Sequence, residues 1–199
     1  YEALAWGRHV NDHRDAWEVV RRADHSHVGL ILDSFHTLAR KIDPETIRRI
    51  PGDKIFFVQL ADAPAIEMDL LYWSRHFRNM PGEGDLAVTA FLQAVLATGY
   101  VGPLSLEIFN DQFRAGLPRL VARDGYRSLV DLMDRARRAE PALAVDLPDF
   151  PPPAAVQAIE FIEIVTSTDQ QAELAGFLAT LGFTPTAQHI SKAVTRWQQ

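Results

Sequence analysis

The fold is decided by the stretch Val28-Gly29-Leu30-Ile31-Leu32-Asp33-Ser34-Phe35-His36. Apart from Gly29, the residues before Asp33 are apolar, and a carboxylate and an imidazole then follow. A short apolar run bounded by polar residues predicts a strand that is buried on both faces, as in a parallel sheet covered by helices. Asp33 then stands at the carboxyl end of the strand, with His36 on the loop beyond it, where α/β proteins build their sites. For this stretch alone, a helix-capping Asp33 and a surface His36 are an equally good hypothesis.

The same order of strand, polar residue, loop and helix recurs through residues 1–140. Apolar strands are predicted at 1–6, 28–33, 55–60 and 103–108. Helices are predicted from Asp12, from Asp43 with Pro44 at the first helical position, from Asp85 to Gly99, and over 117–138. Strands that alternate with helices in this way predict an α/β fold with a parallel sheet.

A long polar and aromatic segment, residues 63–84, separates the strand at 55–60 from the next helix. Segments of this length inside compact domains are usually functional or disordered. Its Trp73, Phe77 and Met80 favour an ordered lid.

The composition changes after Glu140. Residues 141–153 are rich in proline and predict a stiff linker without regular structure. Beyond it we expect a different, α+β module over 154–199, with a strand at 159–165, a helix at about 169–181 and a strand at 193–197. The sequence therefore predicts one domain at 1–140, a linker at 141–153 and a second module from 154.

Composition excludes several classes of function. The chain has 199 residues, a formal net charge of −6 and no cysteine. The acidic balance argues against a nucleic-acid partner, and no apolar run approaches the length of a membrane span. The lack of cysteine excludes disulfides and thiolate metal sites and fits a cytoplasmic protein. Because residues 1–6 have the composition of a strand and no initiator Met precedes them, we interpret the chain as a fragment that begins inside a domain.

Each predicted strand has a polar residue near its end. These residues are Glu2, Asp33, Gln59 and Glu107. Right-handed crossovers would bring all four to one end of the sheet, where three carboxylates repel each other unless a cation lies between them. An oxygen-only ligand set suits a hard ion such as Mg²⁺ or Mn²⁺. The alternative is that polar residues simply end strands.

Further polar residues are expected at the same end of the sheet. The forked guanidinium of Arg78 could hold a carboxylate, although a surface arginine is the alternative. His36 titrates near neutral pH and could carry a proton, or else serve as a hydrogen-bonded neighbour of the ligands. Arg8 and His9 follow the first strand and should line the rim.

Several motifs resemble those of the sugar-phosphate isomerase/epimerase superfamily of xylose-isomerase-like TIM barrels. They are Glu2, Asp33-Ser34-Phe35-His36, Gln59, Arg78-Asn79-Met80-Pro81-Gly82-Glu83-Gly84 and Ser105-Leu106-Glu107. Longer runs are similar to the bacterial 3-dehydroshikimate dehydratases, namely Trp6–Asp12, Val58–Asp62 and Tyr72–Gly84. Those enzymes fuse the barrel to a module that resembles 4-hydroxyphenylpyruvate dioxygenase. Residues 158–199, with Leu181-Gly182-Phe183 and His189–Val194, resemble the start of such a vicinal-oxygen-chelate module.

The resemblance implies both a site and a reaction. Glu2, Asp33, Gln59 and Glu107 would hold one divalent ion, Mg²⁺ or Mn²⁺ with Co²⁺ as a further option. The reaction would convert the small molecule 3-dehydroshikimate into protocatechuate and water. Arg78 would hold the substrate carboxylate and His36 would transfer the proton, with Glu2 or Glu107 as rivals. A metal-dependent sugar or keto-acid isomerase or epimerase is the runner-up.

The chain also departs from the family pattern. Only the second half of a (β/α)8 barrel is expected, because the first four strands are missing, and the second module stops early. Ile190 stands where a basic residue is expected. An inactive fragment that only associates, for instance as a homo-oligomer, is therefore a third hypothesis. We expect the isolated chain to bind Mg²⁺ or Mn²⁺ weakly and to lack activity.

Overall fold

The computed structural model describes residues 1–152 and 154–199, and the chain divides into two compact units. The first unit is Tyr1–Pro151 and the second is Pro152–Gln199. The finer division into a domain, a linker at 141–153 and a module from 154 stays a prediction. Among the described residues, no helix is long and apolar enough to cross a membrane.

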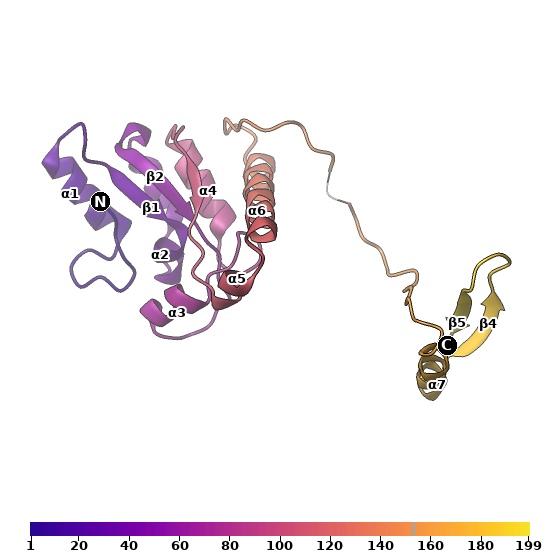
Figure 1. The fold of residues 1–199 in the computed structure, drawn as a ribbon. Helices are drawn as coiled ribbons and strands as arrows, with labels where there is room; N and C mark the ends of the chain where they lie inside the picture. Colours follow the sequence, from indigo (N-terminus) through magenta and orange to yellow (C-terminus); the bar gives the residue numbers. More distant parts are fainter. Residues whose placement is uncertain (153) are drawn as a thin grey trace. The chain divides into compact units, whose positions relative to one another are not determined.

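A parallel sheet forms the centre of the first unit (Figure 1). Its strands are β1 (Leu30–Asp33), β2 (Ile55–Leu60) and β3 (Leu104–Leu106), hydrogen-bonded in that order. Asp33 pairs with Gln59, and Gln59 pairs with Ser105, so the carboxyl ends of the strands lie at one edge. Of the strand predicted at 1–6, only Glu2 pairs, through a parallel bridge to Ile31. The predicted α/β fold is confirmed.

Helices cover this sheet. They are α1 (His13–Ala23), α2 (Ser34–Ala39), α3 (Leu70–His76), α4 (Val88–Ala97), α5 (Asp111–Ala115) and α6 (Pro118–Ala139), with two 3₁₀ helices at Pro44–Arg49 and Gly52–Lys54. In Figure 1, α1 and α6 stand at opposite ends of the row of strands. The fully buried Leu32 and Val58 of the strands join Phe91 of α4 and Leu132 of α6 in one apolar core. This core holds the strand ends in place.

The local structure after Asp33 differs from the predicted loop. Its side chain accepts a hydrogen bond from the backbone N–H of His36, which caps α2 directly after β1. The prediction that His36 lies on a loop is therefore wrong, because the cap starts a helix at Ser34. His36 lies in the first turn of α2 and is buried.

Three other predictions of local structure need correction. The helix predicted from Asp85 starts only at Val88 and has no side-chain cap, because Asp85 instead accepts a hydrogen bond from Ala65 N–H. The helix after Asp43 is 3₁₀, and α5 was not predicted. The segment 63–84 contains α3 and is ordered, as expected for a lid.

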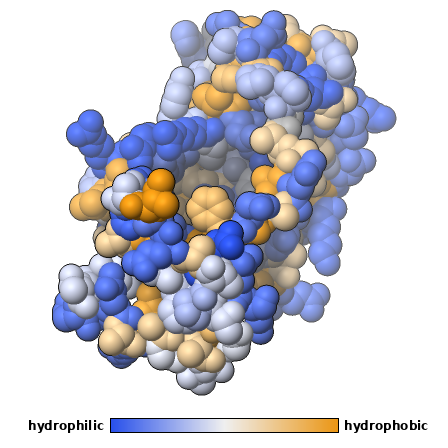
Figure 2. All heavy atoms as spheres, turned by 90° about the vertical axis from the view of Figure 1, so that its right-hand side faces the viewer, coloured by the Kyte–Doolittle hydropathy of each residue, from blue (hydrophilic) through white to orange (hydrophobic). Residues whose placement is uncertain are grey.

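The second unit is small and open. It contains α7 (Gln171–Thr180) and a hairpin of β4 (Thr184–Gln188) and β5 (Thr195–Gln198). The strand predicted at 159–165 is wrong: this segment has no regular structure, and Ile159 and Phe161 are 79% and 77% exposed. A strand needs a neighbour to pair with, and among the described residues the hairpin strands pair only with each other. Figure 2 shows hydrophobic side chains exposed among hydrophilic ones on the face it displays.

Candidate metal and substrate site

The polar residues at the strand ends meet around Arg78. Asp33 ends β1, Gln59 lies in β2, and Glu107 follows β3, where its backbone N–H donates to Leu60. Arg78 comes from the segment after α3 and is completely buried. Its Nη1 donates to Oδ2 of Asp33 at 2.8 Å and to Oε2 of Glu107 at 2.9 Å. One guanidinium therefore bridges two carboxylates.

The remaining donors of Arg78 are also engaged within the chain. Nε and Nη2 donate to Oγ of the buried Ser74 at 3.1 and 2.8 Å. The guanidinium lies 4.8 Å from the centre of the Phe35 ring, a favourable cation–π position. The hypothesis of a surface arginine is thus wrong. A bidentate clamp on a substrate carboxylate is not available either, because only an Nη2–H that faces His36 Nε2 at 3.4 Å is left.

Two buried oxygens in this cluster lack a hydrogen-bond partner among the described residues. Gln59 donates from Nε2 to Oε1 of Glu107 at 2.7 Å, which leaves its own Oε1 unpaired. Oε1 of Glu2 is the other unpaired atom. Buried acceptors without partners are costly and rare, and a cation would satisfy both. The residues present therefore fit a metal ion. The third unpaired atom, Nε1 of Trp73, belongs to an apolar cluster with Phe35.

The charges of the cluster also favour a bound cation. Burial, together with the charges of Asp33 and Glu107, raises the pKa of Glu2 to about 7, against the opposing charges of Arg78 and the N-terminus. Burial also raises the pKa of Glu107, while Arg78 lowers it. One guanidinium thus does not fully offset three crowded carboxylates, and a divalent cation would relieve the repulsion.

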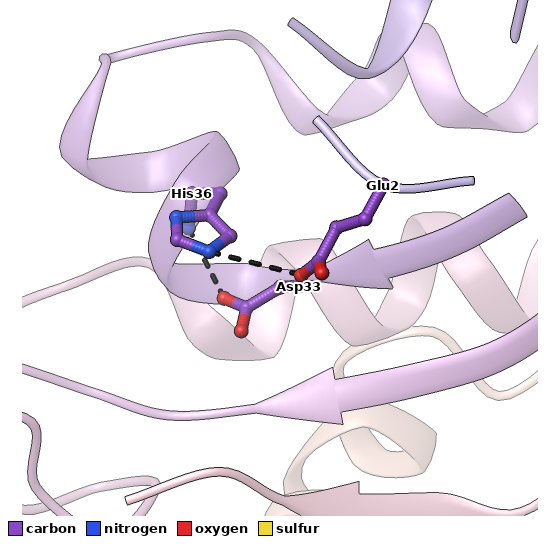
Figure 3. A group of neighbouring side chains, drawn as sticks. All are labelled: Glu2, Asp33 and His36. Atoms are coloured by element: carbon purple, nitrogen blue, oxygen red, sulfur yellow. Dashed lines mark hydrogen bonds and ion pairs between the residues drawn. The ribbon is translucent and has the colours of Figure 1, made fainter. Parts of the chain in front are cut away.

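His36 completes a group that could hold a metal ion together with Glu2 and Asp33 (Figure 3). The ligand atoms of these three residues lie within 4.8 Å of one another. Burial and the Arg78 charge lower the pKa of His36 to about 3, so its ring is neutral. Its Nδ1 accepts a hydrogen bond from Ala5 N–H at 3.2 Å, which assigns the single ring proton to Nε2.

This tautomer gives His36 a different role from that of the oxygen ligands. A protonated Nε2 has no lone pair for a metal, and it lies 3.7 Å from Oε1 of Glu2. The Nε2–H of His36 is thus placed to donate a hydrogen bond, whereas the carboxylates and the Gln59 amide supply oxygens. A small cavity beside it, lined also by Asn11 and His13, gives access to this side of β1.

The remaining predicted residues lie apart from this cluster. Arg8 and His9 are exposed on the loop before α1, and no hydrogen bond or ion pair joins either side chain to the cluster in the described residues. Their role in substrate binding stays a prediction. Sequence reasoning missed Ser74 and the Ala5 N–H. Ser74 lies in α3, four residues before Arg78. Side chains at this spacing meet on one side of a helix, so the spacing could have indicated the contact.

With this geometry established, the family can be stated. A family model described as xylose isomerase-like TIM barrel matches residues 1–136. The chain belongs to the xylose isomerase-like TIM barrel family. This agrees with the parallel strands and with the polar residues at their carboxyl ends.

Individual relatives add detail. Over its whole length the chain is 53% identical to a 3-dehydroshikimate dehydratase of Pseudomonas putida, of which it covers 32%. The solved structure of a xylose isomerase-like TIM barrel/4-hydroxyphenylpyruvate dioxygenase fusion protein is 52% identical with a TM-score of 0.86, and the match spans all of this chain and 33% of that one. A crystal structure of IOLI protein with a binding zinc atom is 27% identical with a TM-score of 0.57, covering 62% of this chain and 44% of that one. The chain thus spans about a third of the length of the relative and the fusion protein.

Proposed function

We propose that this chain supplies the metal-binding part of a 3-dehydroshikimate dehydratase. The observation that carries the proposal is the convergence of Glu2, Asp33, Gln59 and Glu107, two of them with unpaired buried oxygens, in a chain 53% identical to a protein of that name. The match extends through the whole chain, so the whole cluster lies within the matched region.

The cluster defines what the residues would do. The four oxygen donors would hold a divalent ion, for which we propose Mg²⁺ or Mn²⁺, with Co²⁺ as a further option. Such an ion supplies Lewis acidity that stabilises negative charge on a substrate ketone oxygen. Asp33 and Glu107 also keep Arg78 in place, so this guanidinium adds positive charge beside the substrate.

The reaction requires proton transfers at two positions of the substrate. Removal of the proton next to the ketone, followed by loss of a hydroxyl group with a proton as water, leads to aromatic protocatechuate. His36 is the first candidate for proton transfer: its neutral ring can donate a hydrogen bond from Nε2–H to a substrate oxygen, and it could give a proton to the leaving hydroxyl only after taking one up as a base. Glu2 and Glu107 are the rival groups for proton transfer.

The substrate carboxylate needs a partner other than a bidentate Arg78. The single remaining Nη2–H of Arg78 offers one hydrogen bond. Arg8 and His9 on the exposed loop before α1 are the further candidates.

A chimera tests the proposal directly. This chain would replace the matching 32% of the Pseudomonas putida protein, and formation of protocatechuate from 3-dehydroshikimate would be followed by absorbance. We expect turnover that requires added Mn²⁺ or Mg²⁺ and is lost in Glu107→Ala. A folded chimera without turnover, or undiminished turnover in Glu107→Ala, would overturn the assignment. The Arg114→Ala variant is a matched control, because the one ion pair of Arg114 among the described residues is with the exposed Asp111.

We further infer that residues 154–199 begin a dioxygenase-like module. The support is the fusion structure, which matches the whole chain, the second unit included. No two-histidine, one-carboxylate set lies in the described residues of this unit, so we assign it no oxygen chemistry.

A further inference from the structure

Asp62 is a buried carboxylate that the proposed reaction does not use. It lies two residues beyond β2 and is 2% exposed. Its Oδ1 accepts from Ala63 N–H at 2.8 Å and Leu86 N–H at 2.9 Å, and its Oδ2 accepts from Gly82 N–H at 3.0 Å. No ion pair joins it to a cation in the part of the chain that the structure describes. Three backbone donors are therefore what stabilises this buried charge.

These hydrogen bonds attach the loop of residues 79–86 to the segment that follows β2. The backbones of Asp62 and Asn79 exchange two hydrogen bonds, of 2.9 and 2.8 Å, in an antiparallel bridge. Asp85 N–H donates to the Ala63 carbonyl at 2.9 Å. The contact is so close that a Cβ added at Gly84 would lie 2.4 Å from Oδ1 of Asp62. These bonds together hold the loop in place, and the Asp62 carboxylate lies at their centre.

Arg78 immediately precedes this loop. Its backbone N–H donates to the Phe109 carbonyl at 3.2 Å, and its own carbonyl accepts from Nδ2 of Asn110 at 3.1 Å. The end of β3 therefore holds Arg78 on one side, and the bridge between Asn79 and Asp62 holds it on the other. Its guanidinium reaches both Asp33 and Glu107 only while this backbone stays in place.

We propose that Asp62 is a positioning residue for Arg78. It makes no hydrogen bond or ion pair with Glu2, Asp33, Gln59 or Glu107 among the described residues, and it acts by fixing the loop that follows Arg78. A carboxylate is required because Asn would turn one of the two acceptor oxygens into a donor that faces a backbone N–H. The consequence for turnover rests on the proposed function; the placement of Arg78 does not.

The placement is tested on the 199-residue chain by ¹⁵N NMR. A buried Arg Nε–H that donates to Ser74 should exchange slowly and give a separate signal. In Asp62→Asn we expect this signal to shift or broaden and the amides of Gly82 and Leu86 to exchange at least about 10-fold faster. Val20→Ala, a core change in α1 at the opposite end of the row of strands from α6, is the matched destabilised control and should leave the Arg78 signal in place. An unchanged Arg78 signal in Asp62→Asn would overturn the proposal.

The effect on turnover is tested in the chimera. Misplacing Arg78 by about an ångström should lower kcat on the order of 10²-fold, with a smaller change in KM. Asp62→Ala, which removes all three bonds, should lower kcat more than Asp62→Asn, and Val20→Ala should leave kcat unchanged below its melting temperature. Equal losses in Asp62→Asn and Val20→Ala would reduce Asp62 to a merely structural role. If the unsubstituted chimera makes no protocatechuate, the proposed function fails while the NMR result still decides on Asp62.

Discussion

Charged side chains are buried at the carboxyl edge of the first sheet, whereas apolar side chains are exposed at the start of the second unit. At the sheet edge the charged groups are buried, with Arg78 at 0% and Asp33 at 3% exposure. In the second unit no described residue is buried, and Phe161 is 77% exposed. Burial of a large apolar side chain contributes about 1.5–3 kcal/mol, which the second unit forgoes. The difference shows that most polar groups at the sheet edge have partners within the first unit, whereas the apolar side chains of the second unit stay exposed in the described residues.

The largest expected effect comes from removing the cation at the sheet edge. Arg78→Met would remove the counter-charge of the buried Asp33 and the half-buried Glu107, which then keep only hydrogen bonds from neutral N–H groups, and we expect it to lower the free energy of unfolding by about 3–5 kcal/mol. Urea unfolding of the 199-residue chain measures this loss. Arg114→Met, an exposed pair with Asp111, should cost at most about 1 kcal/mol. Equal losses in the two variants would show that burial of the cluster does not matter.

Metal affinity comes next. In the part of the chain that the structure describes, a single bridge to Ile31 joins Glu2 to β1 and β3 is the last strand on the other side, so the outer ligands are loosely held. We expect the isolated chain to bind Mn²⁺ about 100-fold more weakly than the chimera, a difference of about 2.7 kcal/mol. Calorimetric titration of both proteins measures the ratio. Tight one-to-one binding by the isolated chain would contradict the expectation and would indicate that two copies complete the site.

His36 makes stability depend on pH. Its folded pKa of about 3 lies below the unfolded value of 6.5, so its contribution is fully present above pH 6.5 and is lost as the pH falls toward 3. Between pH 6.5 and 5.5 the metal-free chain should lose about 1 kcal/mol more than His36→Gln, which does not titrate. Urea midpoints at the two pH values give the difference. Parallel losses in both proteins would mean that His36 is charged in the folded chain.

The smallest effect is expected in the second unit. Phe161→Ser should change the free energy of unfolding by less than about 0.5 kcal/mol, because the side chain contacts little. The same replacement should reduce self-association in light scattering, since exposed apolar side chains promote it. Phe91→Ser, at a completely buried position in α4, is the contrasting control and should unfold the first unit. A large loss of unfolding free energy in Phe161→Ser would show that this segment packs against other residues in solution.

Predictability from the sequence follows the same division. The strands that carry Asp33, Gln59 and Glu107 could be predicted, because each is a local apolar run that ends in a polar residue. The burial of Arg78 could not, because its partners lie 45 and 29 residues away and meet only in the folded sheet. The placement of His36 in a helix could not be predicted while capping and site formation by Asp33 stood as alternatives, because Asp33 both caps α2 and pairs with Arg78.

The strand predicted at 159–165 failed for a different reason. Its composition is that of a strand, but pairing is a property of two segments, and the described residues offer it no partner.

The bridge that Arg78 forms between Asp33 and Glu107 also bears on how the site would be loaded. A vacant cluster of carboxylates would attract any passing cation, but here a guanidinium already occupies Oδ2 of one and Oε2 of the other. An incoming divalent ion would have to share these two carboxylates with Arg78 and overcome the repulsion of this positive charge, which is tethered to the chain. Monovalent ions, which the carboxylates attract more weakly, would be excluded first, so the protein would select for charge density.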